Sequence, residues 1–305
     1  MGSAELAARI AEDIAGGRWS DGESLPGVRR LASEAGCSPG TAARAYGALR
    51  DRRILVGSER SRFRVGAGGA AAAARWPGEH GALRLAGSDD PALDVLVRTS
   101  GSAARVVDGP RGSVNGIVQL ARGAADAATV HLLHAATGRW NDALARGALG
   151  GEPVQLVHLW RRDQGLVLAP GNPLGIRGIS DLAHHRIAWR SPGTGSRLLL
   201  ESMMRRAGCE PHPALGEPAE SHLAVAAAVA TGAADAGLAV RAVAELAGLE
   251  WIPVATEPFE LALGRASWKA AEPLLDVLAS ASVQRRLSAM PGYDLSMSGE
   301  VRTAA

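Results

Sequence analysis

The sequence predicts an α/β protein in two parts, a small helical domain with a β-hairpin and a larger domain of two α/β lobes. Three observations carry this prediction. The chain has 305 residues, which exceeds one average domain. Helical periodicity dominates residues 1–66, whereas strands and helices alternate from residue 82 onward. We therefore expect domains at 1–66 and 82–290, a linker at 67–81 that is either flexible or helical through its alanines, and a tail at 291–305.

Charge is distributed unevenly along the chain. The net charge is +2, but residues 1–65 hold eleven Arg against eight Asp or Glu, so the positive excess lies in the N-terminal fifth. The distribution of charge is a better guide to a polyanionic partner than the nearly balanced total. Lys269 is the only lysine, which indicates a compositional bias toward Arg rather than a functional choice.

The sequence lacks targeting and metal-binding signals. Cys37 and Cys209 have no CxxC spacing, so we expect neither a metal site nor a disulfide framework. The N-terminus has no apolar signal-peptide segment, and no apolar run is long enough to span a bilayer. These features predict a soluble cytoplasmic protein that does not contact the membrane.

The N-terminal domain is expected to contain three helices and then two strands. Their ranges are 5–15, 28–35, 38–50, 54–56 and 62–65. Leu6, Ile10 and Ile14 recur at helical spacing and form one apolar stripe. Ser38 suits the N-cap of the third helix. Three helices followed by a hairpin is the order of a winged helix-turn-helix.

This order predicts how the domain would meet DNA. The third helix would enter the major groove, and the hairpin would form the wing beside it. The candidate DNA-binding residues are polar or basic and lie on these elements: Arg29, Ser38, Thr41, Arg44, Arg60 and Arg62. The alternative is a small helical domain with a solvated basic face.

Three motifs in this domain resemble the GntR family of bacterial transcription regulators. They lie at 22–32, 36–38 and 41–46. The resemblance implies that Arg29, Thr41 and Arg44 contact operator DNA. Ala43 stands where the family usually has a second basic or polar residue. Residues 60–62, Arg-Ser-Arg, replace the glycine pair that is usual at the wing tip.

From residue 82 the alternation of strands and helices predicts α/β units. About 210 residues are enough for two such lobes with a cleft between them. The expected strands are 83–86, 105–107, 125–133, 154–160, 165–169, 186–189, 234–240, 250–254 and 259–263. The expected helices are one capped by Ser88, one at 114–122 capped by Ser113, and those at 196–207, 221–231, 241–247, 268–280 and 283–290.

The loop at 189–197 is the most distinctive stretch of this domain. Gly193 and Gly195 allow a close approach of the backbone to a ligand, and Thr194 and Ser196 supply hydroxyls and N-caps. A helix that starts here would direct its first N–H groups at an anion. Taken alone, the loop also fits an ordinary capped turn. Two further hydroxyl-bearing helix starts, at 87–90 and 112–115, follow strands, and ligands bind at the carboxyl ends of strands in open α/β sheets.

The same domain resembles the molybdate-binding-like periplasmic-binding-protein domain that is fused to helix-turn-helix domains in bacterial regulators. The matching stretches are 85–94, 112–116, 125–133, 140–141, 164–173, 190–197, 221–226 and 232–237. Trp189 stands where the family often has Asn. On this resemblance the ligand-binding residues are Ser88, Asp89, Ser113, Asn115, His131, Asn141, Arg190, Gly193, Thr194, Gly195, Ser196, Arg197, Glu220 and His222.

Several of these residues also allow structural roles. Glu220 could belong only to the first turn of a helix, and His222 could be a solvated or capping residue. Arg190 and Arg197 could bind an anion or pair with local carboxylates.

Together these features predict a ligand-responsive transcription regulator. Its partners would be operator DNA, a second copy of the chain in a homodimer, and a small effector such as molybdate or an organic acid. No enzyme activity and no cofactor are expected, since Walker, HExxH and GxSxG motifs are missing and the lone Lys269 does not suit a Schiff base. The alternatives are a ligand-free dimerisation scaffold and an enzyme tethered to DNA.

Overall fold

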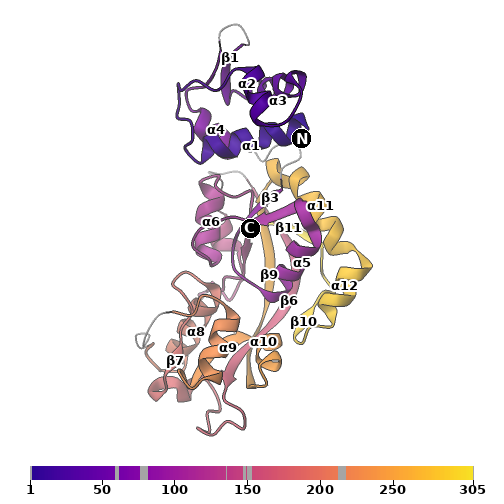
Figure 1. Ribbon diagram of the computed structural model, residues 1–305. Helices are drawn as coiled ribbons and strands as arrows, with labels where there is room; N and C mark the ends of the chain where they lie inside the picture. Colours follow the sequence, from indigo (N-terminus) through magenta and orange to yellow (C-terminus); the bar gives the residue numbers. More distant parts are fainter. Residues whose placement is uncertain are drawn as a thin grey trace.

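The structure is a computed structural model, and it describes residues 2–58, 62–75, 82–134, 136–146, 149, 153–211 and 218–304. The candidate DNA-binding residue Arg60 and the expected linker residues 76–81 lie outside these ranges. The α/β fold class expected from the sequence is confirmed. Figure 1 shows the N-terminal domain at one end, one lobe in the middle and a second lobe at the other end. No helix in the described ranges is long and apolar enough to cross a membrane.

The N-terminal domain has the expected winged helix-turn-helix order. Its elements are α1 (Ser3–Ala15), α2 (Val28–Glu34), α3 (Pro39–Asp51), β1 (Leu55–Ser58) and β2 (Arg62–Val65). The apolar stripe of α1 is buried, because Leu6, Ile10 and Ile14 all face the core of this domain. Tyr46 of α3 packs on Phe63 of β2 with 4.6 Å between ring centroids, so the third helix and the wing are held together.

The alanine-rich run expected as a linker forms a helix, α4 (Gly69–Arg75). Ala73 is buried with the residues of the N-terminal core. The carboxylate of Asp21 accepts hydrogen bonds from the backbone N–H groups of Gly68 at 2.6 Å and Ala70 at 3.0 Å, which caps the helix start. Arg84 in the second domain donates to the carbonyl of Ala74 at 2.7 Å. The junction is therefore held from both sides.

The second domain is built on one mixed sheet with the order β4-β3-β5-β9-β6-β8-β7. Strands β3, β4 and β5 are parallel, as are β7 and β8, while β9 and β6 run antiparallel to their neighbours. The bounds are β3 (Leu83–Gly87), β4 (Ala104–Val106), β5 (Ala127–Val130), β6 (Val154–Leu168), β7 (Ile187–Ala188), β8 (Ala236–Val240) and β9 (Glu250–Gly264).

Helices cover the two ends of this sheet and define two lobes (Figure 1). Lobe 1 contains β3, β4 and β5 with α5 (Pro91–Ser100), α6 (Ser113–Ala121), α11 (Trp268–Ala279) and α12 (Ala281–Ser288). Lobe 2 contains β7 and β8 with α8 (Gly195–Arg206), α9 (His222–Ala230) and α10 (Arg241–Leu246). A short helix, α7 (Asp142–Ala145), lies between β5 and β6 in the chain.

Strands β6 and β9 cross from one lobe to the other, and each is 15 residues long. They pair in antiparallel register from Val154 opposite Gly264 to Leu168 opposite Glu250. The sequence predicted four short strands here, because polar residues interrupt each apolar run. The structure corrects this: the polar residues lie at the crossing between the lobes, where they bond to one another instead of ending the strands.

The expected tail also belongs to the sheet. Strands β10 (Tyr293–Asp294) and β11 (Val301–Thr303) both pair with β6.

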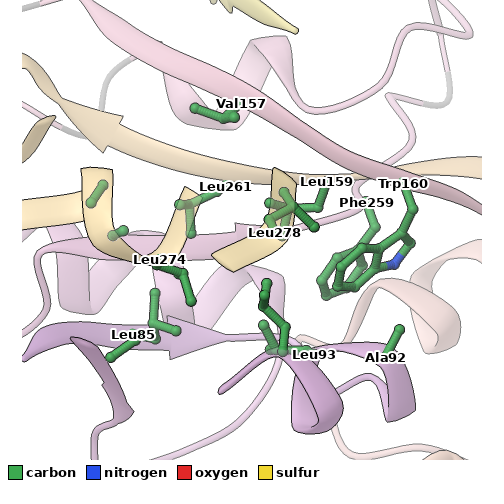
Figure 2. Packing of buried hydrophobic residues seen from close by; sticks show 14 of the residues in the cluster. Leu85, Ala92, Leu93, Val157, Leu159, Trp160, Phe259, Leu261, Leu274 and Leu278 are labelled. Atoms are coloured by element: carbon green, nitrogen blue, oxygen red, sulfur yellow. The ribbon is translucent and has the colours of Figure 1, made fainter. Parts of the chain in front are cut away.

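The core of lobe 1 fixes the position of the crossing strands (Figure 2). Trp160 of β6 and Phe259 of β9 stack with ring centroids 5.4 Å apart and planes 3° apart. Leu93 of α5 and Leu274 of α11 are buried in the same cluster. Aromatic pairs of this kind contribute about 0.5–1.5 kcal/mol beyond the burial of their area. The polar residues beside this pair on β6 and β9 are therefore held on a rigid support.

Candidate functional site

The exposed N-terminal half of α3 carries the candidate DNA-reading residues. Ser38 is the N-cap, and its hydroxyl accepts from the backbone N–H of Thr41 at 3.1 Å. Arg44 is exposed and donates to the Thr41 hydroxyl at 3.4 Å, so the three side chains form one cluster. A helix start with a guanidinium beside it can meet both a phosphate and a base edge.

Two further arginines flank this helix. Arg29 is exposed in the first turn of α2, and Arg62 is exposed at the start of β2 with a positive φ of 58°. A backbone of that kind turns the strand sharply, which suits the tip of a wing. The structure thus places Arg29 and Arg62 on elements that neighbour α3, in positions compatible with phosphate contacts.

The structure corrects the capping roles expected of the serines in lobe 1. Asp90, not Ser88, caps α5, and it accepts from the backbone N–H groups of Ala92 and Leu93. Ser113 lies inside α6, whose N-cap is Gly112. The hydroxyls of Ser88 and Ser113 are instead 2.7 Å apart and buried, at the carboxyl end of β3.

The hydroxyls of Thr194 and Ser196 also bond to groups other than the free backbone N–H groups at the start of α8. Thr194 is the N-cap of α8 without a side-chain cap bond, and its hydroxyl donates to the carbonyl of Ser191 at 2.8 Å. Ser196 is buried, and its hydroxyl accepts from Gln164 Nε2 of β6 at 2.8 Å. Ser196 is therefore the hydroxyl of this loop that contacts the crossing strands.

Direct contacts close the interface between the two lobes, which is called the cleft below. The backbone N–H of Val114 in lobe 1 donates to the carbonyl of Gly193 in lobe 2 at 3.2 Å. Gly195 packs directly on His131, since a Cβ at Gly195 would lie 2.4 Å from the His131 carbonyl oxygen. Arg190 of lobe 2 forms an ion pair with Asp89 of lobe 1. These contacts bring the loop at 190–196 against Asp89, Val114 and His131 of lobe 1.

The crossing strands supply three polar side chains that the sequence analysis missed. Arg162, Gln164 and Glu257 are fully buried. Glu257 Oε1 accepts from Arg162 Nε at 2.9 Å and from Gln164 Nε2 at 2.7 Å, and His131 Nδ1 lies 2.9 Å from the same atom. Arg162 also pairs with Asp90, whose carboxylate accepts from the Tyr293 hydroxyl at 2.9 Å. The signal that could have found them is a run of charged residues inside an otherwise apolar pair of strands.

Burial and charge set the protonation of this cluster. Burial would raise the pKa of Glu257, but His131 and Arg162 outweigh that effect and lower it to about 2. Burial lowers the pKa of His131 despite the neighbouring Glu257 carboxylate. For His222, burial and the nearby charges of Arg190 and Arg162 lower the pKa well below its ordinary value. The cleft therefore holds a charged carboxylate and neutral imidazoles near pH 7.

The buried polar atoms of the cleft that lack a hydrogen-bond partner among the described residues fall into two groups. His131 Nδ1 and Arg162 Nη2 each lie 2.9 Å from Glu257 Oε1 as ion pairs, whereas Gln164 Oε1, Glu257 Oε2 and His222 Nδ1 have no such contact. The amide oxygen of Gln164 and the ionised carboxylate oxygen of Glu257 can only accept hydrogen bonds. Unpaired buried polar atoms are costly, so their concentration at one place marks a site that a polar ligand would complete.

Some predicted ligand residues lie away from this cluster. Asn141 donates to Glu260 at 2.7 Å, Arg197 pairs with Glu201 at 2.9 Å, and Glu220 offers only its carbonyl, to Arg190, with its side chain exposed. Asn115 donates to the carbonyl of Arg111 and lies beside Gly193 at the rim. The structure brings together Ser88, Ser113, His131, Arg190, Ser196 and His222, with Asp89 and the loop glycines at the edge.

The candidate site offers no metal centre in the ranges that the structure covers. No group of three or more His, Cys, Asp or Glu side chains that could hold a metal ion is found there. The side chains of the cleft are hydrogen-bond donors and acceptors of mixed charge. Such an arrangement can bind a small polar molecule, because it combines fixed hydroxyls, an imidazole and a carboxylate in a water-poor setting.

Two protein families match this chain. Residues 96–279, more than half of the chain, match the PBP superfamily domain, and residues 3–65 match the bacterial regulatory proteins of the gntR family. The chain is 30% identical over 195 residues to the uncharacterized protein YvgK of Bacillus subtilis, and the match covers 63% of each chain. It thus spans less than two thirds of that relative. A Clostridium pasteurianum protein encoded in the 5' region of a ferredoxin gene is 31% identical over 111 residues, which is 35% of this chain and 98% of that protein.

Solved structures share the fold at low sequence identity. A mutant of OxyR from Corynebacterium glutamicum superposes with a TM-score of 0.51 at 15% identity, covering 94% of both chains. The regulatory domain of MetR, a LysR family regulator from N. meningitidis, gives a TM-score of 0.50 at 15% identity, covering 71% of this chain and 99% of that domain. These likenesses show a common architecture.

Proposed function

Because this chain belongs to the PBP superfamily and carries a gntR-family domain at residues 3–65, we propose that it is a cytoplasmic, ligand-responsive transcription regulator. The N-terminal domain binds operator DNA through α3 and the wing. A homodimer would present two such domains to paired half-sites. The interlobe cleft binds the effector. The observation that carries this proposal is the set of unpartnered buried atoms at Gln164, Glu257 and His222.

A change in the cleft has a physical route to the DNA-binding domain. Arg84 of β3 holds the carbonyl of Ala74 in α4, and Arg105 of β4 pairs with Glu12 of α1 at 2.9 Å. Lobe 1 therefore contacts α1 and α4, and α1 packs against both α4 and α3. A ligand that draws lobe 2 onto lobe 1 would alter these contacts or the spacing of a dimer. Its effect is limited by its difference in affinity for the two states.

The charges of the cleft favour a particular class of effector. Both arginines are already paired, Arg162 with Asp90 and Glu257, and Arg190 with Asp89. The unpartnered Gln164 Oε1 and Glu257 Oε2 accept hydrogen bonds and cannot donate them. A bare dianion such as molybdate offers only acceptors, and it would meet the Glu257 carboxylate. We therefore favour a small organic acid that also carries hydroxyl or ammonium donors.

A thermal-shift screen tests this choice directly. The chain is mixed in turn with molybdate, tungstate, sulfate, and small hydroxy and amino acids. The proposal expects stabilisation by at least one acid with donor groups, and a binder at a hundred times its Kd stabilises by about 2.7 kcal/mol. Ser196→Ala should reduce the shift, whereas Ser282→Ala on the exposed face of α12 should not. Stabilisation by molybdate alone would overturn the choice of ligand class while leaving the cleft as the site.

The contacts between the lobes also support a second candidate function for this domain. The ion pair between Arg190 and Asp89, together with the Gly193–Val114 bond, joins the lobes through protein groups alone. Such a domain could serve as a ligand-free dimerisation scaffold behind the same DNA-binding domain. No thermal shift with any compound of the screen, combined with a stable dimer in solution, would favour this reading.

A further inference from the structure

A cavity lies on the opposite face of the crossing strands from the cleft residues. Successive side chains of a strand point to opposite faces, so Glu257 and Phe259 face one way, and Pro258 and Glu260 face the other. The cavity has a volume of about 430 Å³. That size falls within the range of about 300–1,000 Å³ that is typical of small-molecule sites.

One side of this cavity is lined by an ion-pair network in which buried carboxylates meet partly exposed arginines. Arg302 of β11 donates to Glu260 at 2.8 Å and also pairs with Asp142, and Arg139 pairs with Asp142 at 2.7 Å, so two guanidinium groups balance the two carboxylates. Asn141 donates to the other side of Glu260. His158 is buried, its Nδ1 lies 4.0 Å from Glu260, and its Nε2 has no hydrogen-bond partner among the described residues.

The rim adds two charges of opposite sign, and the walls are apolar. Arg161 and Glu300 line the cavity with exposed side chains, and neither has an ion pair within the part of the chain that the structure describes. Trp140, Pro258 and Met297 form apolar wall. A ligand that satisfies this lining needs one anionic group, one cationic group and an apolar body.

We propose that this cavity, formed by Arg161, Glu300 and the buried His158 against an apolar wall, is a second ligand site for a small zwitterion such as an apolar amino acid. The carboxylate of the ligand pairs with Arg161, and its ammonium group pairs with Glu300. Its side chain covers Trp140, Pro258 and Met297.

This site is connected to the cleft through two short links. The side chain of Asn141 donates to Glu260 in the cavity lining, and its oxygen accepts from the backbone N–H of Leu132 at 2.6 Å, one residue after His131 of the cleft. Arg161 of the cavity is adjacent in sequence to Arg162 of the cleft. A ligand in the cavity would therefore contact the same crossing strands that join the lobes. Any effect of this ligand on the affinity of the cleft for its own ligand would be reciprocal.

Titration of the full-length chain by calorimetry and ligand-observed NMR tests the site. The probes are leucine, isoleucine, valine, methionine, phenylalanine and tryptophan, up to millimolar concentration. 3-Phenylpropionate, which lacks the ammonium group, and phenethylamine, which lacks the carboxylate, are the matched controls. The proposal expects at least one amino acid to bind, and both phenyl controls to bind at least tenfold more weakly than phenylalanine or not at all.

Variants locate the bound probe. Arg161→Gln and Glu300→Gln should each weaken binding of the amino acid at least tenfold, and Ser196→Ala in the cleft should leave it unchanged. Absence of binding by all six amino acids would overturn the proposal. Binding that resists both rim substitutions but is lost in Ser196→Ala would also overturn it, because the probe would then occupy the cleft. Since the cleft ligand is scored separately by its dependence on Ser196, failure of this second site leaves the proposed function standing.

Discussion

Arg190 in lobe 2 forms an ion pair with Asp89 in lobe 1, and the guanidinium is almost completely buried at 3% exposure of the side chain. Its remaining hydrogen bonds go to the carbonyls of Ala219 and Glu220. The pair therefore joins lobe 2 directly to lobe 1 at the cleft.

Removing the carboxylate of this pair should loosen the closed arrangement. Asp89→Asn would leave the buried Arg190 guanidinium without its counter-ion. Breaking buried pairs costs about 3–5 kcal/mol, and the partial exposure of Asp89 reduces this to about 1–3 kcal/mol. Urea unfolding measures the change. Asp94→Asn is the control, because its pair with Arg98 is exposed and 3.6 Å long. Equal effects of the two substitutions would contradict a special role for the Asp89 contact.

A methyl group at position 195 should keep the lobes apart. The added Cβ of Gly195→Ala would lie 2.4 Å from the carbonyl oxygen and the ring of His131, so lobe 2 must move away. We expect a larger radius of gyration by small-angle X-ray scattering and loss of effector-induced stabilisation. Gly178→Ala serves as the control, because an added Cβ there meets nothing within 4 Å. A Gly195→Ala variant that keeps the wild-type radius and full ligand response would refute the closed-cleft account.

The buried His222 predicts a loss of stability in mild acid. Its pKa is depressed well below 6.5 in the folded chain by burial and by Arg190, Arg162 and His131. The unfolded state therefore binds the extra proton first as the pH falls below 6.5. Folding stability should then decrease by up to about 1.4 kcal/mol per pH unit for this group.

The measurement is urea unfolding at a series of pH values between neutrality and mild acid. His222→Gln should flatten the slope of stability against pH, whatever its effect on absolute stability. His134→Gln is the comparison, because His134 is exposed. An unchanged slope in His222→Gln would mean that other groups govern the acid sensitivity.

The N-terminal half of α3 should dominate sequence-specific DNA binding. Arg44→Ala removes an exposed guanidinium beside Ser38 and Thr41, and the loss of a base contact costs about 1–3 kcal/mol with relaxed specificity at that base. Fluorescence anisotropy with DNA selected from a random pool measures the change. Arg50→Ala removes the same charge from the other end of α3 and should have a smaller, sequence-independent effect. If the two variants bind alike, the recognition-helix assignment is wrong.

Periodicity and turn residues were sufficient to predict most elements from the sequence. The stripe of Leu6, Ile10 and Ile14 gave α1, and the Ser38 cap gave the start of α3, because both signals are local. The crossing strands were not predictable in this way. Arg162 and Glu257 are 95 residues apart, and only their pairing across β6 and β9 makes a charged residue acceptable inside a strand.

Local sequence patterns likewise predicted only part of the candidate site. Ser88, Ser113 and Ser196 were candidates because hydroxyls after strands are a local pattern, but the helix caps are Asp90, Gly112 and Thr194. Asp90 took the cap of α5 because its carboxylate reaches both Ala92 and Leu93. Asn141 was expected in the cleft, yet its side chain turns to Glu260, a residue that lies 119 positions later in the chain.

The most direct test of the central claim is the affinity of the chain for selected DNA, measured with and without the acid identified by thermal shift. The account predicts that the acid changes the Kd for DNA at least fivefold in the wild-type chain, which is the lower end of typical allosteric coupling of about 1–3 kcal/mol. It predicts little or no change in Gly195→Ala, although that variant still binds DNA. An identical change in both proteins, or no change in the wild-type chain, would contradict control of DNA binding by closure of the cleft.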